Sequence, residues 1–189
     1  MTAVGFRCDA GPEIGVGHLV RCVALAEELR GRGVEVVFLG AVNGSEWARA
    51  QLGARGLPLV AAPADPAGLA ALARRLGLGA VVLDSYELAR ETGAALRGAG
   101  LAVLAIVDGD PLGQDADLYL DQNLGADHRP PPAASARLGE AAASARPVGA
   151  KGSAGRPGGA KGSAGWPGGA RVSARWLAGA RYVLLRDSV

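Results

Sequence analysis

The chain has 189 residues, enough for one domain with a sizeable apolar core, and 49% of them are hydrophobic. Its net charge of +2 is uneven, because residues 1–136 carry 11 Arg against 16 Asp and Glu, whereas residues 137–181 carry 8 Lys and Arg against one Glu. This dispersed positive charge has no aromatic platform, which argues against nucleic acid as a partner. Arg7 and Asp9 interrupt any signal sequence and no apolar run approaches membrane-spanning length, so we expect a cytoplasmic protein without a membrane partner.

The first two-thirds of the chain alternates between strand and helix patterns. Strands are predicted over residues 4–8, 34–39, 57–60, 80–84, 101–107 and 118–120, and helices over 18–30, 45–55, 65–76 and 87–99. The run at 34–39 is almost continuously apolar, which is typical of a parallel strand covered on both faces. The alternation predicts an open, mostly parallel, Rossmann-like α/β sheet over residues 1–129.

The composition changes near Pro130. The sequence GAKGSAGRPG at 149–158 recurs at 159–168 with one difference, Arg156 against Trp166. Gly, Ala, Ser and Pro dominate, so the segment lacks the apolar side chains that would offset an ordering entropy of about 1–2 kcal/mol per residue. We predict a disordered low-complexity linker over residues 130–178, with Trp166 and Trp176 exposed to water, followed by a remnant of an interdomain segment at 179–189.

Three loops follow predicted strands at the same edge of the sheet: residues 11–18, 84–86 and 108–110. Ligands of open α/β sheets bind beyond the carboxyl ends of the strands, so we expect the functional site here. The first loop has the spacing G-x3-G-x-G-H, which is neither a dinucleotide-binding nor a Walker A motif. Its glycines, Gly15 and Gly17 among them, permit a close backbone approach, and the helix that follows favours an anion at its N-terminus.

His18 closes this loop, and because histidine is the residue type that most often serves as a proton acceptor in catalysis, it is a candidate general base. The spacing alone equally permits a tight turn with a structural histidine. Cys8 and Cys22 lack both a CxxC spacing and a histidine at zinc spacing, so we expect reduced structural cysteines and no metal. No serine lies in a nucleophile-elbow pattern, which disfavours covalent catalysis.

Several other polar residues lie near these loops, and for most of them the sequence leaves two interpretations open. Asp9 could orient His18 or hold its own loop by an Asx turn. Asp84 could bind a ligand or cap the next helix. Asp108 and Asp110 could form an acid/base pair, but their Gly-Asp-Pro context favours an ordinary turn.

The remaining candidates are positively charged residues, amides and a second histidine. Arg7 and Arg21 flank the glycine loop and could pair with a phosphate, although Arg21 could equally cover the helix surface. Gln122 and Asn123 could bind hydroxyl or amide groups. His128 lies beside Arg129 and three prolines, and we expect it to be a solvated loop residue.

One long motif and three short ones carry a family resemblance. The string FRCDAGPEIGVGHLVRCVALAEEL at 6–29 resembles the opening of the nucleotide-sugar hydrolases of the pseudaminic acid pathway and of related spore-coat polysaccharide proteins. VVLDSYEL at 81–88, DADLYLDQN at 115–123 and RYVLLR at 181–186 follow in the same order. These families are similar in turn to glycosyltransferases of the two-domain GT-B fold, so the resemblance implies a GT-B N-terminal domain.

The resemblance also implies a reaction and a set of residues. The reaction is release of UDP from a UDP-linked diacetamido-trideoxy sugar by water, without a cofactor. The implied catalytic residues are His18 and Tyr86, and the implied substrate-binding residues are Arg7, Asp9, Gly15, Gly17, Arg21, Asp84, Gln122 and Asn123. Members of the family carry a second α/β domain that supplies most of the nucleotide site. The chain could therefore be a truncation, a frameshifted remnant or one half of a split enzyme, and a split enzyme would have a protein partner bearing that domain.

Other functions share these features. The chain could be half of a GT-B glycosyltransferase that transfers a sugar to an alcohol rather than to water. It could be a non-catalytic module that binds a sugar or a protein. Because residues 137–181 are positively charged, the chain could also be an adaptor that binds an acidic partner, which is the least favoured of these hypotheses.

Overall fold

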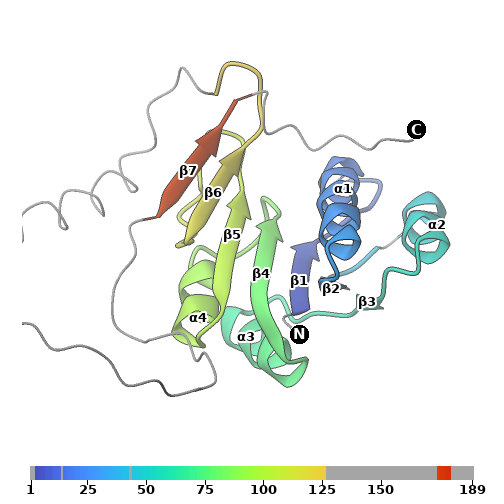
Figure 1. Cartoon of the computed structure of the whole chain (residues 1–189), viewed down its shortest axis with the longest axis horizontal. Helices are drawn as coiled ribbons and strands as arrows, with labels where there is room; N and C mark the ends of the chain where they lie inside the picture. Colours follow the sequence, from blue (N-terminus) through green and yellow to red (C-terminus); the bar gives the residue numbers. More distant parts are fainter. Residues whose placement is uncertain (1–2, 14, 43, 127–173, 180–189) are drawn as a thin grey trace, which may run out of the picture.

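The computed structural model describes residues 3–13, 15–42, 44–126 and 174–179. Within them a seven-stranded sheet has the order β3-β2-β1-β4-β5-β6-β7, and every neighbouring pair is parallel (Figure 1). The strands are β1 (Ala3–Cys8), β2 (Glu35–Leu39), β3 (Leu59–Val60), β4 (Leu78–Asp84), β5 (Ala102–Ile106), β6 (Leu118–Asp121) and β7 (Arg175–Ala178). The predicted parallel α/β fold is therefore confirmed.

Four helices connect these strands: α1 (Gly17–Gly31), α2 (Glu46–Ala54), α3 (Pro66–Arg75) and α4 (Thr92–Gly98). Two of them start where the sequence supplies a cap. The Ser45 hydroxyl accepts a hydrogen bond from the Ala48 N–H, and the Asp65 carboxylate accepts one from the Gly68 N–H. A side-chain acceptor at this position satisfies one of the unpaired N–H groups of the first helical turn.

An apolar core lies on each face of the sheet. Alternate residues of β1 divide between the two faces: Phe6 and Cys8 pack with α1 and α2, where Phe6 stacks on Phe38 of β2 at a centroid distance of 5.2 Å. On the other face, side chains of β4 and β5 such as Val81 and Val103 pack with α3 and α4. Burial on both faces explains why the strands are nearly continuous apolar runs.

Helix α4 is shorter than predicted. The sequence predicts a helix over 87–99, but the regular helix covers Thr92–Gly98 only. Gln114, from the loop before β6, donates to the carbonyl oxygen of Ala89 at 2.9 Å and accepts from the Gly93 N–H at 2.9 Å. The Gln114 side chain therefore forms hydrogen bonds with backbone groups on either side of Thr92. The residues from 87 to 91 do not form part of the regular helix.

The seventh strand lies where the sequence predicts linker. Residues Arg175–Ala178 form β7, which pairs with β6 along its whole length, and Trp176 packs against Tyr119 at a centroid distance of 5.4 Å. Trp176 is half-buried rather than exposed. The predicted linker therefore does not include these four residues, and residues 130–173 of it lie outside the described part of the chain.

The strand order reverses between β1 and β4. From β1 the chain moves outward through β2 and β3, and then returns to place β4 on the other side of β1. The loops after β1 and β4 therefore lead to opposite faces of the sheet, and such a reversal is where open α/β sheets bind their ligands. This topology brings the loop containing His18 next to the end of β4.

Candidate functional site

The glycine loop ends at an uncapped helix terminus. Gly11 and Gly15 exchange two backbone hydrogen bonds, and Gly15 has a φ of 81°, which favours glycine. Val16 occupies the N-cap position of α1 without a side-chain hydrogen bond, and the first turn contains no acidic residue. A Cβ atom added to Gly15 or Gly17 would meet nothing within 4 Å, so this terminus is open to an approaching anion.

His18, the second residue of α1, forms a buried pair with Asp84, the last residue of β4. The His18 Nδ1 atom lies 2.6 Å from Oδ1 of Asp84, and the Asp84 side chain has no exposed surface. A carboxylate only accepts hydrogen bonds, so the contact places the proton on Nδ1 and leaves Nε2 able to take a proton. Asp84 does not cap the following helix, whose N-cap residue is Glu91.

Arg21 binds two carboxylates, that of Asp84 at the end of β4 and that of Asp108 in the loop after β5. Its Nε and Nη2 atoms donate to the two oxygens of Asp84 at 2.6 and 2.5 Å, and its Nη1 atom donates to Asp108 at 3.2 Å. Burial alone would lower the pKa of Arg21, but the hydrogen bonds and charges of Asp84 and Asp108 outweigh it and raise this pKa. The guanidinium therefore stays charged and holds β4 and the loop after β5 together.

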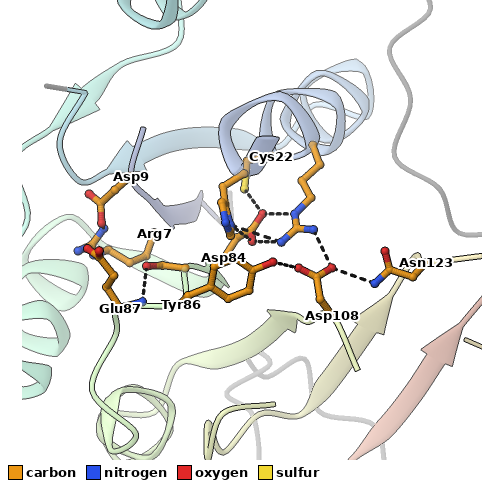
Figure 2. Close-up of polar contacts among 11 residues, drawn as sticks. Arg7, Asp9, Cys22, Asp84, Tyr86, Glu87, Asp108 and Asn123 are labelled. Atoms are coloured by element: carbon orange, nitrogen blue, oxygen red, sulfur yellow. Dashed lines mark hydrogen bonds and ion pairs between the residues drawn. The ribbon is translucent and has the colours of Figure 1, made fainter. Parts of the chain in front are cut away.

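Asp108, two residues after β5, accepts hydrogen bonds from the side chains of Arg21, Tyr86 and Asn123 (Figure 2). Its Oδ2 atom accepts a hydrogen bond from the Tyr86 hydroxyl, and its Oδ1 atom accepts one from Asn123 Nδ2 at 2.9 Å as well as that from Arg21. The ring of Tyr86 meets the ring of His18 edge to face, with centroids 4.7 Å apart. Tyr86 therefore borders the pair of His18 and Asp84, and Asn123 is linked to Tyr86 through Asp108.

Cys22 lies one turn of α1 beyond His18 and is completely buried. Its thiol donates to Oδ2 of Asp84 at 3.4 Å. Burial, together with the neighbouring Cys8 and Asp84, raises the pKa of Cys22 well above its usual value, so the thiol stays neutral. A neutral buried thiol is a poor nucleophile, and Cys22 acts here as a structural donor to Asp84.

Arg7 and Asp9 form a separate pair at the end of β1. Arg7 Nη1 donates to Asp9 at 2.5 Å, and the other carboxylate oxygen of Asp9 accepts the Ala41 N–H at 2.9 Å. Asp9 therefore secures the loop after β2, and the carboxylate that pairs with His18 is Asp84 instead. A Cβ at Gly40 would lie 2.2 Å from the carbonyl oxygen of Cys8, so this close approach requires glycine.

The structure thus brings together five of the predicted site residues: His18, Arg21, Asp84, Tyr86 and Asn123. Arg7 and Asp9 pair with each other, and Gln122 is half-buried directly after β6. The turn predicted at Asp108 and Asp110 is present, since Asp110 accepts the Leu112 N–H, but the turn interpretation missed the role of Asp108. Its position after a parallel strand was the available signal.

Two further observations concern metal ligands and membrane-spanning helices among the described residues. No group of three or more His, Cys, Asp or Glu side chains in residues 3–13, 15–42, 44–126 and 174–179 is arranged to hold a metal ion. In the same part of the chain, no helix has both the length and the apolar character needed to cross a bilayer. The arrangement offers a proton acceptor at His18 Nε2, anion-binding N–H groups on α1 and several carboxylate acceptors.

Two solved structures are similar to the structure of this chain. Neither a family model nor a curated protein matches the chain. The structure of MurG from Acinetobacter baumannii is similar with 21% identity and a TM-score of 0.52, and the match covers 68% of this chain and 42% of MurG. HepE from Anabaena, determined in complex with UDP and glucose, has 12% identity and a TM-score of 0.44 over 65% of this chain and 38% of HepE.

The chain therefore spans less than half the length of each of these two structures. At this identity, the likeness to MurG bears on the fold and not on the reaction. Together with the seven parallel strands, it shows that the described residues form a Rossmann-like parallel α/β sheet similar to that of MurG.

Proposed function

We propose that this chain forms the first α/β half of a nucleotide-sugar hydrolase, in which His18 removes a proton from a water molecule that attacks the anomeric carbon. The observation that carries the proposal is the buried contact of 2.6 Å between His18 Nδ1 and Asp84, beside the uncapped start of α1. The proposal is supported by the position of His18 and of the N–H groups at the start of α1, because both lie at the carboxyl edge of the sheet beside the strand reversal.

The contact with Asp84 gives His18 the properties of a general base. Asp84 fixes the imidazole with its proton on Nδ1, so that Nε2 can accept a proton, and it stabilises the imidazolium that forms. A general base of this kind accelerates a reaction by about 10²–10⁴-fold. The charged Arg21 donates to both oxygens of the same carboxylate, which holds Asp84 in place beside the imidazole.

The start of α1 suits the leaving group. A nucleoside diphosphate gains negative charge as the anomeric bond breaks, and the helix N–H groups and partial positive charge favour that change. A diphosphate is already a good leaving group, so a strong general acid is not required. The resemblance of residues 6–29 supports UDP as the nucleotide and a diacetamido-trideoxy sugar as the substituent.

The test follows UDP release from UDP-sugars by the purified chain, alone and with the second domain of a resembling hydrolase supplied separately. His18→Ala is expected to lower turnover by about 100-fold or more, because the general base is lost. His128→Ala, the same substitution at the other histidine of the sequence, is the control and is expected to retain turnover. Near-normal turnover by His18→Ala would remove His18 from the chemistry.

Isotope labelling identifies the bond that breaks. In ¹⁸O-labelled water, attack at the anomeric carbon places the label in the released sugar, whereas attack at phosphorus places it in UDP. Label in UDP would contradict the proposed step even if His18 proved essential. UDP release that requires an added alcohol, with the sugar joined to that alcohol, would instead indicate the glycosyltransferase alternative.

A further inference from the structure

Tyr86 lies at the rim of the site with its hydroxyl already engaged. The residue is 59% exposed, and its ring stands at 83° to the ring of His18. The hydroxyl donates its hydrogen to Oδ2 of Asp108. A phenol has a single O–H to donate. Because this hydrogen is already bonded to Asp108, the Tyr86 oxygen can only accept a hydrogen bond from a ligand.

Asp108 remains ionised, which fixes the direction of this hydrogen bond. Burial would raise the pKa of Asp108, but the hydrogen bonds from Tyr86 and Asn123 and the charge of Arg21 outweigh it and lower this pKa. An ionised carboxylate has no proton to donate. In the same contact, the hydrogen bond to Asp108, with burial, raises the pKa of Tyr86, and the phenol stays protonated.

We propose that Asp108 is a positioning residue that turns Tyr86 into a hydrogen-bond acceptor toward the ligand, so that Tyr86 recognises a hydroxyl or amide N–H of the sugar and not a phosphate oxygen. The inference rests on the proposed function and deepens it. Carboxylate and phenol oxygens gather at the ends of β4 and β5, whereas N–H donors gather at the start of α1. The ligand is thereby oriented with its diphosphate toward α1 and its sugar toward Tyr86.

The first measurement tests the pairing itself in the full chain, without any ligand. Ultraviolet titration of the wild type minus that of Tyr86→Phe gives the ionisation of Tyr86 among the three tyrosines of the sequence. Asp108→Asn is expected to lower the pKa of Tyr86, because the negative acceptor is lost and the neighbouring Arg21 charge remains. Asp110→Asn, in the same turn, is the matched control and is expected to leave this pKa unchanged. An unchanged pKa in Asp108→Asn would overturn the pairing.

The second measurement compares two probes, UDP and UDP-N-acetylglucosamine, by NMR titration of the full chain. If Tyr86 accepts a hydrogen bond from the sugar, Tyr86→Phe weakens binding of UDP-N-acetylglucosamine by about 3- to 10-fold and leaves binding of UDP unchanged. An equal loss for both probes would show that Tyr86 contacts the phosphates and would overturn the proposal. Asp108→Asn is expected to reproduce the selective loss, while Asp110→Asn binds both probes as the wild type does.

The two measurements separate this inference from the proposed function. Loss of turnover in His18→Ala together with an unchanged Tyr86 titration in Asp108→Asn would overturn the role of Asp108 alone. If neither probe binds even when the second domain of a resembling hydrolase is supplied separately, the nucleotide-sugar proposal fails, and recognition of a sugar by Tyr86 fails with it. The titration would then still decide whether Asp108 fixes Tyr86 as a donor.

Discussion

The carboxylate of Asp84 has no contact with water and accepts hydrogen bonds from three side chains of α1: His18, Arg21 and Cys22. A buried charge is tolerated only when it is paired and hydrogen-bonded. The same residue therefore serves two purposes, because it orients the candidate base and neutralises the charge of Arg21. Mutations at this position are expected to affect stability as well as chemistry.

Asp84→Ala is expected to lower the free energy of unfolding by about 3–5 kcal/mol, because it leaves the largely buried Arg21 without its main partner. Chemical denaturation monitored by circular dichroism measures this change. Glu28→Ala is the matched control, since it breaks the exposed pair of Glu28 and Arg32 on the same helix and is expected to change stability by less than about 0.5 kcal/mol. Equal effects of the two substitutions would contradict the role of Asp84 in the core.

At the scale of single elements, the start of a helix was predictable where its capping group is close in sequence. Asp65 and Pro66 start α3 where the sequence predicts, because their capping is local. Helix α4 starts later than predicted, because Gln114, more than 20 residues away in sequence, bonds the backbone before it. Local patterns therefore predicted the helices whose ends are capped locally and missed an end set by a tertiary contact.

Substitution of alanine for glycine is expected to have opposite effects on stability at Gly53 in α2 and at Gly93 in α4. Gly53→Ala in α2 is expected to stabilise the chain by about 0.5–1 kcal/mol, since its Cβ would meet nothing within 4 Å and alanine favours the helix. Gly93→Ala in α4 is expected to destabilise it, since its Cβ would lie 2.3 Å from the carbonyl oxygen of Asp115. Thermal unfolding of both variants measures the difference, and a stabilised Gly93→Ala would show that α4 does not pack against the loop containing Asp115.

At the scale of the whole molecule, the sheet has a protected centre and two edges. β1 and β4 lie at the centre with a strand on each side, whereas β3 and β7 lie at the edges, and β7 is reached only after residues 127–173. Amide hydrogen exchange should be slowest in β1 and β4 and fastest in β3 and β7, because edge strands open locally at lower free energy. Equal protection of β7 and β4, measured by mass spectrometry or NMR, would show that β7 unfolds only with the whole sheet.

The fold was largely predictable from the sequence, and the site was predictable in part. Continuous apolar strands alternating with capped helices predict a parallel sheet, and the glycine loop draws attention to His18. The pairing of His18 with Asp84 rather than Asp9 could not be predicted, because it depends on which strand lies next to β1. Asp108 was assigned to a turn for the same reason, since its partners come from three other segments of the chain.

The strand reversal between β1 and β4 also bears on how the site arises during folding. The three side chains of α1 that contact Asp84 are separated from it by 62 to 66 residues, so no local segment can assemble the base and its partner. Contacts of this range form only after a long loop has closed, which makes them slow to form. During synthesis, the imidazole would acquire its partner only once β4 had docked beside β1. The cost of closing the loop grows slowly with its length, so extra residues in the connections around β3 should leave the finished site intact.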